Sequence, residues 1–138
     1  MKYKILLFFS CLLTICLNTS CNKAKLTHSI SAHTWVVTEV SHPFYFAKIG
    51  DEFTFYDNRL LFKNSNGFES DGRWDLTERG TVSSPNVDAL FIYSDFGEHD
   101  FSIVNWTEDE LELYEPYVQN PNTLSVIRGL TLRLEPKK

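Results

Sequence analysis

The chain has 138 residues, which suits a single domain, and its formal net charge is −5. Loss of Lys2 and Lys4 with the first 20 residues would leave 11 basic and 18 acidic residues, a net charge of −7. Because an acidic domain repels nucleic-acid phosphates and anionic lipid head groups, we expect no nucleic-acid partner and no membrane attachment through charge.

The first 20 residues have the three-part order of a secretory signal peptide. Lys2 and Lys4 make the start positive, residues 5–17 are almost wholly apolar, and residues 18–20 are small or polar. This apolar run of 13 residues is shorter than the roughly 20 that a membrane span needs. We therefore predict that residues 1–20 are removed during export.

Cys21 ends the segment Leu-Asn-Thr-Ser-Cys, which resembles a bacterial lipobox. The resemblance implies cleavage before Cys21 and a lipid on its thiol, and two or three acyl chains hold a protein stably on a membrane. The alternative is an ordinary secretory signal in which this cysteine has no role. Cys11 and Cys16 would leave with the signal, so we expect no disulfide in the mature chain.

The lipid on Cys21 makes a membrane of the bacterial cell envelope the expected partner. Some Bacteroides-type lipoproteins carry an acidic export tag after the cysteine that sends them to the cell surface. Residues 22–33 contain no acidic residue, so we expect the outer membrane, facing the periplasm. These residues also lack a sustained period, which predicts a flexible lipidated tether over residues 21–33 ahead of one domain over residues 34–138.

From residue 35 onward the apolar residues alternate with a period of two, which is typical of β-strands. The predicted strands are residues 35–40, 52–56, 60–63, 73–77, 87–93, 101–106, 111–114 and 129–135. Asn66-Gly67 predicts a hairpin turn, Asp71-Gly72 a turn or bulge, and residues 95–98 another turn. Residues 78–86 and the segment between Pro116 and Pro121 are predicted to be loops.

About eight short strands joined by tight turns predict an all-β sandwich or barrel. The succession of hairpins favours a small antiparallel up-and-down barrel, which has no exposed edge strands. A barrel of eight strands encloses an interior that is either filled by side chains or holds one small ligand.

The chain over residues 33–135 resembles the lipocalin-like lipoproteins of Bacteroides-type bacteria. The resemblance rests on Trp35 at the first strand, Gly-Asp-Glu-Phe-Thr-Phe at residues 50–55, Gly-Arg-Trp-Asp-Leu at residues 72–76, and residues 101–104 followed by 107–113. His33 occupies the position of the glycine in the lipocalin Gly-x-Trp signature. The resemblance implies a lipocalin-like barrel and, by analogy, a binding role.

Of 20 aromatic residues, 17 follow residue 20, and they support either a solid core or a pocket for an apolar ligand. We expect inward side chains, and candidate ligand contacts, at Phe53, Phe55, Trp74, Phe91, Tyr93 and Phe101, with Ile103 also inward. Residues 42–50 form a loop with three consecutive aromatic residues, Phe44, Tyr45 and Phe46. Lipocalins place a lid loop here, so these three are also candidate ligand contacts; the alternative is a loop that only plugs the barrel.

Arg128 lies in phase with the leucines of the last predicted strand. An inward guanidinium needs a charged partner or an aromatic face. Lipocalins stack a late arginine on the tryptophan of the first strand, so the resemblance implies that Arg128 closes the barrel against Trp35. The alternative is a bulge at Gly129 that turns Arg128 outward.

No catalytic motif, phosphate loop or metal-ligand spacing is present in the sequence, so we expect no enzyme activity, metal site or cofactor. The leading hypothesis is a membrane-tethered protein that binds a small hydrophobic molecule inside its barrel. The alternative is an envelope interaction or inhibitor module with a filled barrel, which contacts a protein or glycan through residues 42–50 and 115–124. A third hypothesis is a hydrolase, which a clustered histidine–carboxylate pair in a cleft would support.

Overall fold

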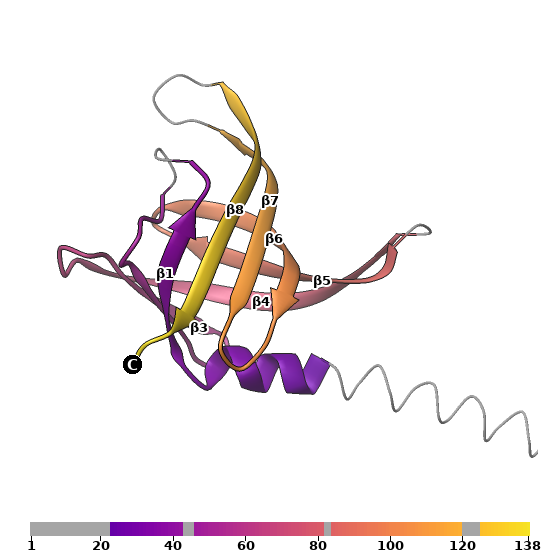
Figure 1. Ribbon diagram of the computed structural model, residues 1–138, viewed down its shortest axis with the longest axis horizontal. Coiled ribbons are helices and arrows are strands. Elements are labelled where there is room, and N and C mark those ends of the chain that lie inside the picture. Colours follow the sequence, from indigo (N-terminus) through magenta and orange to yellow (C-terminus); the bar gives the residue numbers. More distant parts are fainter. Residues whose placement is uncertain (1–22, 43–45, 82–83, 120–124) are drawn as a thin grey trace, which may run out of the picture.

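The computed structural model describes residues 23–42, 46–81, 84–119 and 125–138 (Figure 1). Its strands are β1 (Thr34–Val40), β2 (Glu52–Phe55), β3 (Arg59–Lys63), β4 (Glu69–Thr81), β5 (Ser84–Ser94), β6 (Gly97–Trp106), β7 (Leu111–Gln119) and β8 (Val126–Pro136). Each strand pairs antiparallel with the next, and β8 pairs with β1, so the sheet closes into a barrel. The predicted fold class, an up-and-down barrel of eight strands, is confirmed.

Two hairpins are longer than the sequence predicted. β4 and β5 stay paired as far as Thr81 and Ser84, so most of the predicted loop over residues 78–86 is strand. β7 and β8 stay paired as far as Gln119 and Val126, so Pro116 lies within a strand and not at the start of a loop. Both hairpins extend past their neighbouring strands and project from the barrel (Figure 1).

Glycines mark one confirmed turn and one wrong prediction. Gly67 has φ +84° in the β3–β4 turn, where the Asn64 side-chain oxygen accepts hydrogen bonds from the N–H groups of Asn66 and Phe68. Gly72 lies inside β4, where a turn or bulge was predicted. A Cβ at Gly72 would lie 2.5 Å from the carbonyl oxygen of Tyr93, so the missing side chain lets β4 and β5 approach closely.

Large apolar side chains fill the interior of the barrel. Each is at most 6% exposed: Trp35, Val37, Phe53, Phe55, Leu60, Phe62, Trp74, Leu76, Leu90, Ile92, Phe101, Leu111, Leu113, Leu130, Leu132 and Leu134. The Phe53 ring centroid lies 5.1 Å from that of Phe62, and the Phe55 centroid lies 5.3 Å from that of Trp74. Rings at these separations are in van der Waals contact, as in a close-packed core.

A helix over residues 23–31 lies across one end of the barrel, which we call the helix end (Figure 1). Leu26 and Ile30 are four residues apart, so they share one face of the helix, and both are 1% exposed within the core. The Trp35 indole N–H donates a hydrogen bond to the carbonyl oxygen of Ile30 at 2.8 Å. The prediction of a flexible tether is therefore wrong over residues 23–31. Leu26 and Ile30 anchor this segment to the core, but two apolar residues are too few to show a helical period in the sequence.

Among the described residues, no helix is both long enough and apolar enough to cross a membrane. The opposite end of the barrel, which we call the loop end, carries residues 41–42 and 46–51 and the β3–β4 and β5–β6 turns. The Asp51 carboxylate is 2% exposed there and accepts hydrogen bonds from the N–H groups of Lys48 (2.8 Å) and Ser65 (2.9 Å). Asp51 thereby fastens the loop after β1 to the turn after β3.

Substitution of Leu26, a buried residue of the helix, tests whether residues 23–31 pack against the core. Leu26→Ala should lower the free energy of unfolding by about 2–5 kcal/mol, because it leaves a cavity among buried side chains. Lys25→Ala, at an exposed position of the same helix, should change it by less than about 0.5 kcal/mol. Urea unfolding followed by tryptophan fluorescence gives both values. Equal, small effects of the two substitutions would contradict the packing of this helix.

Candidate functional site

The interior positions predicted to touch a ligand instead contact one another. Phe53, Phe55 and Phe101 are each 1% exposed and Trp74 is 6% exposed, so their inward orientation is confirmed. Exposures of 1% leave no water-sized space beside Phe53, Phe55 and Phe101. The interior is therefore a packed core at the positions proposed for a ligand pocket.

Phe91 and Tyr93 face the outside of the barrel, so the prediction of inward rings is wrong for both. Leu90 and Ile92 are the inward residues of β5, at 0% and 1% exposure, whereas Tyr93 is 45% exposed. The error arises because β5 carries apolar residues in both phases of its alternation, and the aromatic phase was taken as the inner one.

Phe46 fills the loop end of the barrel. Its ring stacks on Phe96 with centroids 4.5 Å apart and on His99 at 4.0 Å, and it meets the edge of Phe53 at 6.1 Å. Phe44 and Tyr45, the other two residues of the predicted lid, lie outside the described residues. The packing of Phe46 agrees with a loop that plugs this end.

A buried histidine–carboxylate pair lies beneath Phe46. His99 is 8% exposed and Glu115 6% exposed, and Nδ1 of the histidine is 3.1 Å from Oε2 of the carboxylate. The N–H of Asp100 also donates a hydrogen bond to Glu115, at 3.4 Å. The pair contains the groups of a catalytic dyad, but aromatic rings cover it, so it has the surroundings of a structural interaction.

The sequence contains a signal for this pair that alternation within a single strand does not reveal. His99 is in phase with the inward Phe101 on β6, and Glu115 is in phase with the inward Leu111 and Leu113 on β7. A polar residue in the inward phase of a strand is expected to find a polar partner inside. Two such residues on neighbouring strands therefore predict contact, once the strands are known to pair.

The predicted stacking of Arg128 on Trp35 is wrong. Trp35 pairs with Pro136, close to the end of β8, whereas Arg128 is near its start and pairs with Tyr117 on the projecting part of β7. Arg128 is exposed and Gly129 has φ +73°, but β7 and β8 keep one register from Leu111 paired with Leu134 to Gln119 paired with Val126, so the bulge of the alternative is absent. Arg128 is exposed because it lies on the projecting part of the hairpin. At the helix end of the barrel the Trp35 indole N–H instead donates its hydrogen bond to the carbonyl oxygen of Ile30 in the helix.

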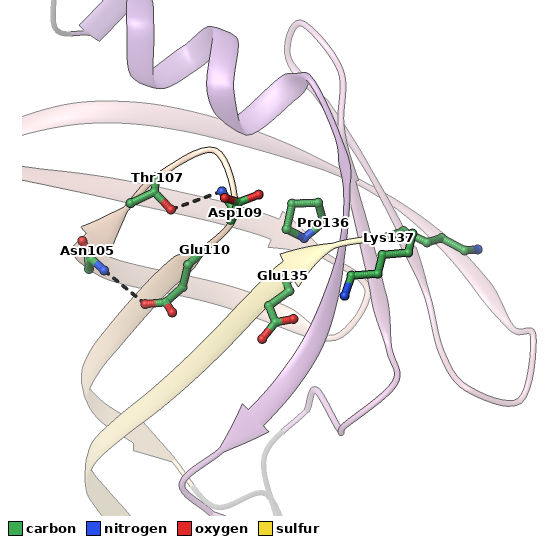
Figure 2. A pocket seen from close by; sticks show the side chains of 8 residues that line it. Asn105, Thr107, Asp109, Glu110, Glu135, Pro136 and Lys137 are labelled. Atoms are coloured by element: carbon green, nitrogen blue, oxygen red, sulfur yellow. Dashed lines mark hydrogen bonds between the residues drawn. The ribbon is translucent and has the colours of Figure 1, made fainter.

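A hollow at the helix end, lined by residues of the β6–β7 turn and the end of β8, has a volume of about 520 Å³. Figure 2 shows two hydrogen bonds within it: Asn105 donates to Glu110 at 3.1 Å, and the N–H of Asp109 donates to Thr107 at 3.2 Å. Lys137 forms an ion pair with Glu52, 2.8 Å away. These contacts shape the β6–β7 turn and the end of β8.

A second hollow, of about 390 Å³, lies on the wall formed by β4 and β5. Its lining residues are Asn58, Arg73, Trp74, Asp75 and Tyr93. A third hollow, of about 500 Å³, shares Asn58 and Arg73 with it and is also lined by Arg59, Asp71 and Gly72. The two hollows adjoin at Asn58 and Arg73, and we call them together the β4–β5 depression.

The projecting part of β7 and β8 exposes large side chains. Tyr117 is 66% exposed and Val126 61%, and Arg128 lies directly across from Tyr117. Tyr114, which is 37% exposed, lies in the barrel wall, where it pairs with Ser102 on β6. Exposed tyrosine and arginine side chains are the types enriched at the centres of protein–protein interfaces.

No cluster of three or more histidine, cysteine, aspartate or glutamate residues suited to a metal ion occurs in the described part of the chain. No model of a known protein family matches the sequence. No curated protein and no solved structure matches it either. The function of this protein is therefore inferred from the geometry of the chain itself.

Substitutions at the buried pair test its structural role. Glu115→Ala should lower the free energy of unfolding by roughly 3 kcal/mol, because it removes the carboxylate that faces the buried His99 ring. The double variant His99→Phe, Glu115→Leu should recover most of this loss, because well-packed apolar residues replace buried polar pairs at little cost. Thermal unfolding of the three proteins gives the comparison, and a double variant less stable than Glu115→Ala would contradict this role.

Proposed function

We propose that the mature protein is an interaction module of the bacterial cell envelope, anchored to a membrane by a lipid on Cys21. Its filled interior is the observation that carries this proposal. Side chains that a ligand would need to displace, such as Phe53, Phe55 and Leu90, are at most 1% exposed and pack against one another. The filled core favours a function at the outer surface over the binding of a small hydrophobic molecule inside the barrel.

The projecting β7–β8 hairpin is the surface that fits a protein partner best. Tyr117 and Val126 present apolar area to solvent, and Arg128 adds a planar charged group beside Tyr117. Large exposed side chains gain the most from burial by a partner. The sequence-based alternative predicted a contact within residues 115–124, and the described residues 115–119 include Tyr117.

A hydrolase is less well supported than an interaction module. The His99–Glu115 pair is buried, and Phe46 stacks on the His99 ring with centroids 4.0 Å apart. A general base must come within hydrogen-bond reach of its substrate, and this ring is covered on one face and 8% exposed.

Site-specific photo-cross-linking tests the proposed surface. A photoreactive phenylalanine analogue in place of Tyr117 should yield cross-linked adducts with an envelope protein in living cells. The matched control is the same substitution at Tyr56, which is 49% exposed in the β2–β3 turn at the helix end and should yield none of these adducts. Absence of adducts at position 117, or identical adducts at both positions, would contradict the proposal.

Cell fractionation and palmitate labelling test the lipid anchor on Cys21. Cys21→Ala should move the protein from the membrane fraction to the soluble fraction, because the acyl chains provide the attachment. Labelled palmitate should enter the wild-type protein alone. Incorporation of palmitate into the variant would show that the lipid is attached elsewhere.

A further inference from the structure

We propose that the short link between Cys21 and the docked helix holds the helix end of the barrel on the head groups of the membrane that carries the lipid. The β7–β8 hairpin then points away from that membrane. The inference rests on the lipid anchor proposed above and adds the surface that the domain presents to lipid. The partner of the helix end is a bilayer surface with zwitterionic head groups.

The chain between the lipid and the helix is very short. Only Asn22 separates Cys21 from Lys23, where the described helix over residues 23–31 begins. Two residues span at most about 7 Å, even when the chain is fully extended. Because the acyl chains enter the hydrocarbon layer, Cys21 lies at the head groups. The first residue of the helix is therefore held close to the membrane surface.

The helix cannot swing away from the barrel as a flexible tether would. Leu26 and Ile30 are each 1% exposed within the core, and the carbonyl oxygen of Ile30 accepts the hydrogen bond of the Trp35 indole at 2.8 Å. The Ser29 hydroxyl donates to the carbonyl oxygen of Thr107 in the β6–β7 turn at 3.5 Å. A membrane that holds Lys23 therefore also holds the end of the barrel on which the helix lies.

The outward face of the helix suits close contact with head groups. Its exposed residues are small or basic, and none is acidic: Lys23, Ala24, Lys25, His28, Ser31 and Ala32. A lysine stem can lie along apolar material while its ammonium group reaches a phosphate. Tyr56, 49% exposed in the β2–β3 turn at the same end, adds an apolar ring with a polar hydroxyl group, a type of side chain enriched at membrane interfaces.

Charges of both signs surround the helix, which fits zwitterionic head groups. The exposed charged residues of the neighbouring turns and strand ends are Asp57, Arg59, Glu108, Asp109, Glu135, Lys137 and Lys138. Two of the basic groups are already paired, Arg59 with Asp71 and Lys137 with Glu52. An anionic surface would repel the carboxylates, whereas a zwitterionic surface offers phosphates to the lysines and ammonium groups to the carboxylates.

The wall formed by β4, β5 and β6 is less suited to lie on the membrane. Asp75, Glu98 and Asp100 share its outer face with Arg73, because the strand register places all four in the outward phase. Three carboxylates against one guanidinium make this group acidic, so lipid phosphates repel it. The domain therefore stands on its helix end in preference to this wall.

This orientation sets the position of the proposed interaction surface. The β7–β8 hairpin leaves the barrel at the end remote from the helix (Figure 1). Tyr117 lies six residues beyond Leu111, which begins β7 at the helix end, and this separation is about 20 Å along the strand. A partner therefore reaches Tyr117 and Arg128 from the aqueous side, without entering the head-group layer.

Quenching of a fluorophore by a nitroxide on a lipid head group tests the orientation. The full chain, lipidated by the cell, is reconstituted into phosphatidylcholine and phosphatidylethanolamine vesicles that contain the nitroxide lipid. The fluorophore is attached to one introduced cysteine, Lys25→Cys, Tyr56→Cys or Tyr117→Cys; it reacts there alone, because Cys11 and Cys16 leave with the signal and Cys21 carries the lipid. We expect strong quenching at positions 25 and 56 and loss of most of it at position 117.

A spacer tests the role of the short link. About twenty glycine and serine residues inserted between Asn22 and Lys23 span roughly 25 Å, so they should remove most of the quenching at positions 25 and 56. Vesicle flotation separates this inference from the anchor. A protein that does not float with the vesicles would overturn both the anchor and the orientation. A protein that floats with equal quenching at all three positions, with the strongest quenching at position 117, or with quenching that the spacer leaves unchanged, would overturn the orientation alone.

Discussion

Hydrophobic packing inside the closed sheet is the constraint on which the other features of this protein depend. Trp35 lies where the first strands, the last strand and the helix meet. It pairs with Phe53 on β2 and Pro136 on β8, and its indole N–H donates a hydrogen bond to the carbonyl oxygen of Ile30 in the helix. Burial of each large apolar side chain contributes roughly 1.5–3 kcal/mol. Closure of the barrel, placement of the helix and the solidity of the core thus reinforce one another around a single residue.

A filled interior moves recognition to the outer surface. At the helix end Leu26 and Ile30 complete the core, and at the loop end Phe46 packs over His99 and Phe53. The outer wall is more varied than a barrel of minimal size requires, because the β4–β5 and β7–β8 hairpins run beyond the strands beside them. The β7–β8 extension supplies Tyr117, Val126 and Arg128, from which the proposed interaction surface is built.

The strands and their order could be predicted from the sequence because a half-buried strand shows its burial as alternation. Prediction failed where that pattern is ambiguous or too short. β5 is apolar in both phases, so Phe91 and Tyr93 were placed inside, and the helix contributes only Leu26 and Ile30 to the core, so its segment was taken for a tether. The His99–Glu115 pair needed the pairing of β6 with β7, which the sequence of either strand alone does not contain.

Native mass spectrometry of residues 22–138 purified from bacterial cells tests the filled interior most directly, because this fragment retains every residue that the structure describes. An interior occupied by its own side chains predicts a single species at the mass of the polypeptide, with no apolar molecule retained after gentle desolvation. A small hydrophobic molecule bound at near one-to-one stoichiometry, and lost only on unfolding, would contradict a packed core and return the site of recognition to the inside of the barrel.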